Sequence, residues 1–123
     1  MTVLAGNVAG NSGLPTNANG TAAYFNSPLG ITTDNTYLYV ADYGNNAVRR
    51  VELAAPNAVL LIAGSSAGTA GSLTNTTGTS ALLSSPFAIT YAAGALYVAD
   101  QGAALIRKVT TTSPFAVSEF TLN

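Results

Sequence analysis

The sequence consists of two copies of one pattern, 58 residues apart. Leu-Tyr-Val-Ala-Asp at residues 38–42 returns unchanged at 96–100, and Ser-Pro-Leu-Gly-Ile-Thr at 27–32 returns as Ser-Pro-Phe-Ala-Ile-Thr at 85–90. A fixed period of this length is typical of an array of one supersecondary unit, which cannot bury its apolar surface alone. We therefore expect residues 1–123 to form a single two-repeat unit. Repeat one covers about 3–60 and repeat two about 61–122.

Each copy contains four short stretches with the composition of β-strands. Tyr and Val alternate there with Leu and Ala, between turns rich in Gly, Asn and Pro. The expected strands are 29–33, 37–41, 47–53 and 58–63 in copy one, and 87–91, 95–99, 105–111 and 116–122 in copy two. Helix signals are weak, and 21–25 and 79–83 offer room for one turn. We expect an all-β fold of two four-stranded antiparallel meanders, each the blade of a β-propeller.

The first copy resembles an NHL repeat in two segments. These are Phe-Asn-Ser-Pro-Leu-Gly-Ile at 25–31 and Leu-Tyr-Val-Ala-Asp-Tyr-Gly-Asn-Asn-Ala-Val-Arg at 38–49. The second copy is similar but degraded, with Ala in place of Gly30 and Ala-Ala in place of Asn45 and Asn46. The resemblance implies a six-bladed propeller, usually a scaffold for protein or other ligands. Some relatives are lyases or hydrolases with His and metal ligands at the central channel, and those residues have no counterpart here.

The charge and residue content exclude several classes of function. The chain has four basic and five acidic side chains, so it lacks the clustered positive charge that binds nucleic acid or anionic lipid. No apolar run is long enough to span a membrane. Cys and His are both absent, which removes thiolate nucleophiles, the commonest general base and the commonest metal ligand. We expect a protein that is not an enzyme and that uses no cofactor.

We expect no signal peptide within this sequence, because no basic segment followed by an apolar core is present near residue 1. The richness in Thr, Ser, Asn and Gly mildly favours an exported bacterial protein. A cytoplasmic location is the alternative.

The charged residues are placed equivalently in the two copies. Asp42 lies seven residues before Arg49, and Asp100 lies seven residues before Arg107. One interpretation makes the two Asp residues carboxylates for acid–base chemistry or metal binding. The favoured interpretation is structural: each Asp accepts turn N–H groups and pairs with the Arg of the next strand. Turn-fixing residues must recur in every repeat, whereas catalytic carboxylates rarely do.

Ligand contacts are predicted in two places. The long Gly-, Asn- and Thr-rich segments at 6–27 and 64–85 carry polar side chains suited to hydroxyl-rich ligands, and equally suited to being solvated. Tyr43 follows Asp42 at a turn, and Gln101 stands at the same place in copy two. The predicted contacts are Tyr43, Gln101, Asn17, Asn19 and Asn75.

Self-assembly is expected, since two blades leave two faces uncovered. Two blades per chain, with the six implied by the resemblance, give a homotrimer that closes a six-bladed ring. Residues 2–5 match residues 60–63 of the fourth strand, and residues 118–121 occupy the equivalent place at the C-terminus. We expect one of these segments to complete a blade across the chain junction, and the N-terminal one is favoured.

Three hypotheses of function follow. The first is a non-enzymatic scaffold that presents a binding face to a protein or carbohydrate ligand. The second is a lyase or hydrolase of the kind found among NHL relatives. The third is an inactive fragment of a longer propeller, which further 58-residue repeats beside this stretch would favour.

Overall fold

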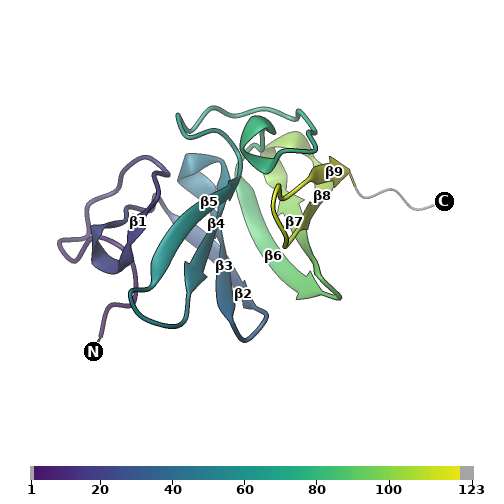
Figure 1. Cartoon of the computed structure of the whole chain (residues 1–123). Coiled ribbons are helices and arrows are strands. Elements are labelled where there is room, and N and C mark those ends of the chain that lie inside the picture. The colour runs from purple at the N-terminus through teal and green to yellow at the C-terminus, as the bar shows by residue number, and fades with distance from the viewer. Residues whose placement is uncertain (1, 120–123) are drawn as a thin grey trace.

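The computed structural model describes residues 2–119, which fold into two antiparallel sheets standing side by side (Figure 1). The first sheet has five strands in the order β1-β5-β4-β3-β2, and the second has four in the order β6-β7-β8-β9. The all-β class is therefore confirmed. The described chain contains only single 3-10 turns and no α-helix, and no helix in it is long and apolar enough to cross a membrane.

The expected strands form within one or two residues of their predicted bounds, except at the C-terminus. The first sheet contains β1 (Ala18–Asn19), β2 (Pro28–Thr33), β3 (Tyr37–Asp42), β4 (Ala47–Glu52) and β5 (Ala58–Ala63). The second contains β6 (Pro86–Ala92), β7 (Ala95–Asp100), β8 (Leu105–Thr110) and β9 (Val117–Glu119). Pro28 is the first residue of β2 and Pro86 is the first residue of β6, a position where a missing backbone N–H is tolerated. The predicted strand 116–122 extends beyond the described residues.

Four 3-10 turns occur as two pairs, with one turn of each pair in each copy of the repeat. They are η1 (Gly20–Ala22), η2 (Tyr43–Asn45), η3 (Gly78–Ser80) and η4 (Gln101–Ala103). The turns η1 and η3 overlap the beginnings of segments 21–25 and 79–83, where the sequence predicts one helical turn. Residues Asn46 and Ala104 end η2 and η4 in the left-handed conformation, with φ of 53° and 56°. Asn tolerates this conformation better than Ala does, so the second turn is the more strained of the two.

The two terminal segments take different courses within the chain. Residues 2–5 form no strand with their own chain, so their pairing with a neighbouring copy stays a prediction. Val117–Glu119 pairs with β8 of the same chain, with Glu119 opposite Arg107. The fourth position of the second sheet is thus filled from within the chain, at least as far as Glu119. In the first sheet β5 fills the fourth position, and a fifth strand that the sequence did not predict, the two-residue β1, pairs with its outer edge.

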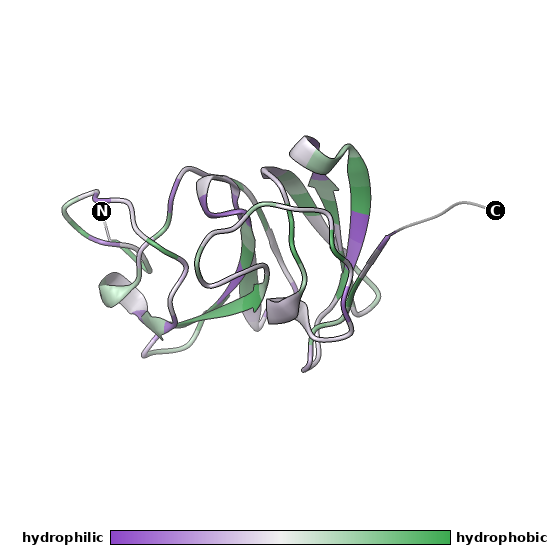
Figure 2. Ribbon diagram, turned by 90° about the horizontal axis from the view of Figure 1, so that it is seen from above, coloured by the Kyte–Doolittle hydropathy of each residue, from purple (hydrophilic) through white to green (hydrophobic). Residues whose placement is uncertain are grey.

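The main core lies between the two sheets. Strand β6 packs against β2 and β3, and the most buried side chains of both sheets meet there. Apolar residues run along the central strands of each sheet, while the loops are more polar (Figure 2). The core side chains are Tyr39, Val48, Ile62, Ala63, Ala81, Leu83, Leu96, Val98, Val109, Phe115 and Val117. A second, smaller cluster covers the other face of the first sheet, with Ala23, Val40, Val51 and Val59 at its centre.

The turn between β2 and β3 is held by one carboxylate. Asp34 accepts the N–H groups of Thr36 and Tyr37, and its second oxygen accepts the Tyr39 hydroxyl at 2.7 Å. Partial burial works to raise the pKa of Asp34, but these hydrogen bonds outweigh it and hold that pKa below its ordinary value of 3.8. Burial and the bond to Asp34 raise the pKa of Tyr39. Copy two has Ala92 at the matching position.

We expect Asp34→Asn to lower the free energy of unfolding by about 1 kcal/mol at neutral pH, because a weaker acceptor replaces the carboxylate. Because the pKa of Asp34 is lower in the folded state, the ionised carboxylate stabilises the fold at pH values above its ordinary pKa. This contribution is lost as the pH falls through the folded-state pKa. The difference between the variant and the parent should therefore shrink toward pH 2. Urea unfolding at pH 7 and pH 2 measures it, and a difference independent of pH would contradict the assigned role of the charge.

Candidate functional site

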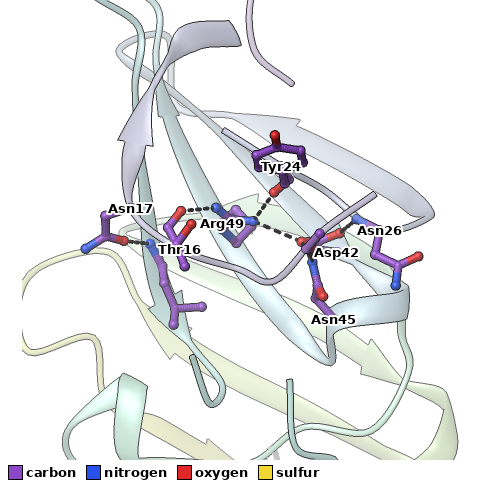
Figure 3. A network of polar contacts seen from close by, with 9 residues as sticks. Thr16, Asn17, Tyr24, Asn26, Asp42, Asn45 and Arg49 are labelled. Atoms are coloured by element: carbon purple, nitrogen blue, oxygen red, sulfur yellow. Dashed lines mark hydrogen bonds and ion pairs between the residues drawn. The ribbon is translucent and has the colours of Figure 1, made fainter. Parts of the chain in front are cut away.

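The first buried ion pair joins β3 to β4 and to the long N-terminal segment (Figure 3). Asp42 Oδ2 lies 3.1 Å from Arg49 Nη1 and accepts the Asn45 side-chain amide at 2.8 Å. Its other oxygen, Oδ1, accepts the Asn26 N–H at 2.8 Å. Arg49 also donates to the carbonyl oxygens of Tyr24, at 2.8 Å, and Thr16, at 2.7 Å. One carboxylate and one guanidinium thus fix a turn, a strand pair and a loop together.

The second pair repeats this geometry. Asp100 Oδ2 lies 2.9 Å from Arg107 Nη1, and Asp100 Oδ1 accepts the Ser84 N–H at 2.7 Å. Arg107 donates to the carbonyl oxygens of Leu82 and Leu73, both at 3.0 Å. Ser84 and Leu82 match Asn26 and Tyr24, whereas Leu73 lies one residue before the match of Thr16. The Asn45 amide has no equivalent, since Ala103 stands there.

Burial dominates the electrostatics of both pairs. All four side chains are fully buried. Burial lowers the pKa of Arg49 in spite of the neighbouring Asp42, and burial raises the pKa of Asp100 in spite of the bonds from Ser84 and Arg107. Each charge is tolerated because its partner and the surrounding carbonyl and N–H groups replace water. With no access to solvent, these carboxylates cannot exchange protons with a bound substrate.

No metal centre is assembled from the described residues. They contain no group of three or more Asp, Glu, His or Cys side chains that could hold a metal ion. The two Asp residues that most resemble ligands are separated into different sheets, and each is saturated by its own Arg and backbone N–H.

The predicted ligand contacts do not converge on one site. Asn17 Oδ1 accepts the Leu61 N–H at 2.7 Å, and Asn75 Oδ1 accepts the Thr77 N–H at 2.9 Å, so both amides are used by the fold. Asn19 lies on β1 opposite Ala58, at the outer edge of the first sheet. Tyr43 and Gln101 begin η2 and η4, at the opposite end of the strands. Two pairs occupy equivalent positions of the two copies, Asn17 with Asn75 and Tyr43 with Gln101, and the two amides of the first pair are already used by the fold.

Two apolar surfaces remain open, one on each sheet, and sequence reasoning anticipated them only in general terms. We call the first the apolar groove: it has a volume of about 420 Å³ and lies on the side of the first sheet turned away from the second. Its walls are Val3, Leu4, Ala5, Phe25, Pro28, Leu29, Gly30, Ile31, Leu38, Val40 and Val51. We call the second the outer face of the second sheet, lined by Ala88, Ile89, Thr90, Tyr97, Ala99 and Ile106.

Comparison with known proteins places the fold but not a function. No family model matches the chain, and no curated protein matches it. A solved structure, a structural genomics protein of unknown function from Bacteroides thetaiotaomicron VPI-5482, is similar with a TM-score of 0.73 and 22% sequence identity. The match covers 92% of this chain and 26% of that protein. This chain therefore has the fold of about a quarter of a larger protein.

Proposed function

We propose that this chain is a pair of NHL-type propeller blades and serves as a non-enzymatic binding scaffold. The observation that carries the proposal is the way in which its Asp and Arg side chains are bonded. The two Asp–Arg pairs are buried and duplicated at the same spacing, and both oxygens of each Asp accept internal hydrogen bonds, so neither of these two carboxylates is free for chemistry. The similarity of this chain to about a quarter of a larger protein supports a repeat unit.

A complete ring would need more blades than one chain has. Three copies would supply six, the number that the NHL resemblance implies. The turns η2 and η4 would then recur around one end of the ring, with Tyr43 and Gln101 alternating there. Six such turns offer a repeated contact surface, and a half-buried Tyr such as Tyr43 can contact protein or carbohydrate with the part of its ring that stays exposed. A lyase or hydrolase is disfavoured, because identical chains add no new residue type.

Binding to arrayed glycans and peptides tests this function. We expect the purified chain to bind one ligand class, and Tyr43→Ala to weaken that binding without changing the melting temperature. Asn19→Ala is the matched control, since Asn19 lies at the other end of the strands and its side chain forms no cap hydrogen bond. Turnover of polysaccharide or ester substrates by the purified chain would contradict the scaffold.

A further inference from the structure

The interface between the two sheets is made from two different faces. The first sheet contributes Tyr39 and Val48, and both are fully buried. The second sheet contributes Leu96, Val98 and Val109, which are also fully buried. Because the sheets are copies of one another, each carries the counterpart of the face that the other uses.

Those counterparts are the two surfaces that remain open. Leu38, Val40 and Val51 match Leu96, Val98 and Val109, and they line the apolar groove. Tyr97 and Ile106 match Tyr39 and Val48, and they line the outer face of the second sheet. The difference in burial is large: Ile106 is 47% exposed, whereas Val48 is 0% exposed. The two-sheet unit therefore carries one half of the internal interface on its first sheet, in the apolar groove, and the other half on the outer face of its second sheet.

The N-terminal segment already stands where a preceding sheet would be. Gly6 N–H donates to the Gly20 carbonyl at 3.2 Å, as Gly64 N–H donates to the Gly78 carbonyl at 3.1 Å. The Leu4 carbonyl faces Gly20, and the Ile62 carbonyl faces Gly78 in the same way. Residues 3–5 therefore lie over the groove in the position that the end of β5 takes over the second sheet.

We propose that the apolar groove binds the outer face of the second sheet of another copy of this chain, head to tail. This interface repeats the internal one, and the inference rests on the proposed repeat architecture. The residues that complement the groove are those of the chain itself, and this selects a second copy over an unrelated partner. A heterologous contact of this kind generates a closed ring or an open filament.

Two positions distinguish the new interface from the internal one. Asn46 crosses the internal interface: its amide donates to the Gly68 carbonyl at 2.9 Å, and its oxygen accepts the Ser85 N–H at 2.8 Å. Ala104 matches Asn46 and lacks this side chain, so Gly10 and Ser27 of the next copy receive no such contact.

The second position is a close backbone approach. A Cβ at Gly30 would lie 3.0 Å from the Phe87 carbonyl and 3.1 Å from the Ala88 Cα. Ala88 takes the place of Gly30 in the new interface and brings that Cβ with it. The contact between copies is accordingly weaker than the contact within one.

Restoring the missing side chain provides a gain-of-function test. We expect Ala104→Asn to lower the concentration at which the assembly dissociates by about tenfold, because two hydrogen bonds are added. Ala93→Asn is the matched control, since Ala93 also has a left-handed φ, of 49°, but lies in the turn between β6 and β7. Sedimentation velocity over a dilution series measures both variants. Equal shifts in the two would mean that Asn only relieves backbone strain, and would overturn the proposed interface.

A charged residue on the outer face provides the loss-of-function test. We expect Ile106→Lys to give a folded monomer, with the circular dichroism spectrum of the parent. Val8→Lys is the control: Val8 is 72% exposed and matches Ser66, which is also exposed. Assembly that survives Ile106→Lys, or a parent chain that is monomeric throughout, would overturn the inference. Ligand binding is measured separately on the arrays, so failure of the interface and failure of the scaffold function are distinguishable.

Discussion

Replacing Asp100 by Ala is expected to lower the free energy of unfolding by about 3–5 kcal/mol, because it leaves the Arg107 guanidinium buried without a counter-charge. The Ser84 N–H also loses its acceptor. Domains of this size are stable by about 5–15 kcal/mol, so this change removes a large fraction of the total. Urea unfolding followed by circular dichroism measures the loss. Asp42→Ala should behave alike, since Asp42 holds Arg49 in the same way.

The control removes both charges together. In Asp100→Leu with Arg107→Met, no unpaired charge remains, and the double variant should be more stable than Asp100→Ala. The carbonyls of Leu82 and Leu73 lose their donor, so some destabilisation relative to the parent is expected. If Asp100→Ala melts like the parent but loses binding or metal affinity, then the carboxylate is functional and the structural role is wrong.

Gly78→Ala is expected to destabilise the chain by about 3 kcal/mol or more, the upper range for overpacking. A Cβ at Gly78 would clash with the Ile62 carbonyl and would lie 2.5 Å from the Phe115 carbonyl. Both neighbours are backbone atoms, so neither can move aside as a flexible side chain would. The Gly78 N–H also donates to the Pro114 carbonyl at 2.8 Å, which holds the glycine in place. Thermal melting measures the loss.

Gly20 is the matched control in copy one. A Cβ there would lie 3.4 Å from the Pro56 carbonyl and 3.5 Å from the Leu4 carbonyl, which is ordinary contact. Gly20 has a positive φ of 44°, so Gly20→Ala carries a conformational cost of about 1–2 kcal/mol and no clash. Gly78→Ala should therefore be clearly the more destabilising of the two. The reverse order would mean that the linker before β6 is not held between Ile62 and Phe115.

The sequence was sufficient for the strands because their signals are local. Pro28 and Pro86 begin strands because Pro has no backbone N–H to donate within a sheet. Alternation of Tyr and Val with other residues indicates a pleated, half-buried segment. The spacing of Asp and Arg was also informative. Antiparallel pairing of β3 with β4 places Asp42 opposite Ala47 and near Arg49, so a separation of seven residues becomes a contact.

Features that depend on distant partners could not be predicted in the same way. Asn17 was predicted as a ligand contact, but its oxygen caps the Leu61 N–H across 44 residues of sequence, and no local pattern encodes this bond. The same holds for Asn46, whose bonds to Gly68 and Ser85 exist only because the two sheets pack together. The short strand β1 and the course of residues 2–5 likewise depend on where β5 and Gly20 lie.

Native mass spectrometry of the purified chain tests the central claim most directly, because the proposed interface repeats one that lies inside each chain. Three chains of 12.3 kDa would close a six-bladed ring, so the account predicts a dominant species of about 37 kDa, three times the chain mass. Ile106→Lys should reduce this species to folded chains of 12.3 kDa. A folded monomer of the parent chain at every concentration, or an open-ended series of masses, would contradict the closed ring.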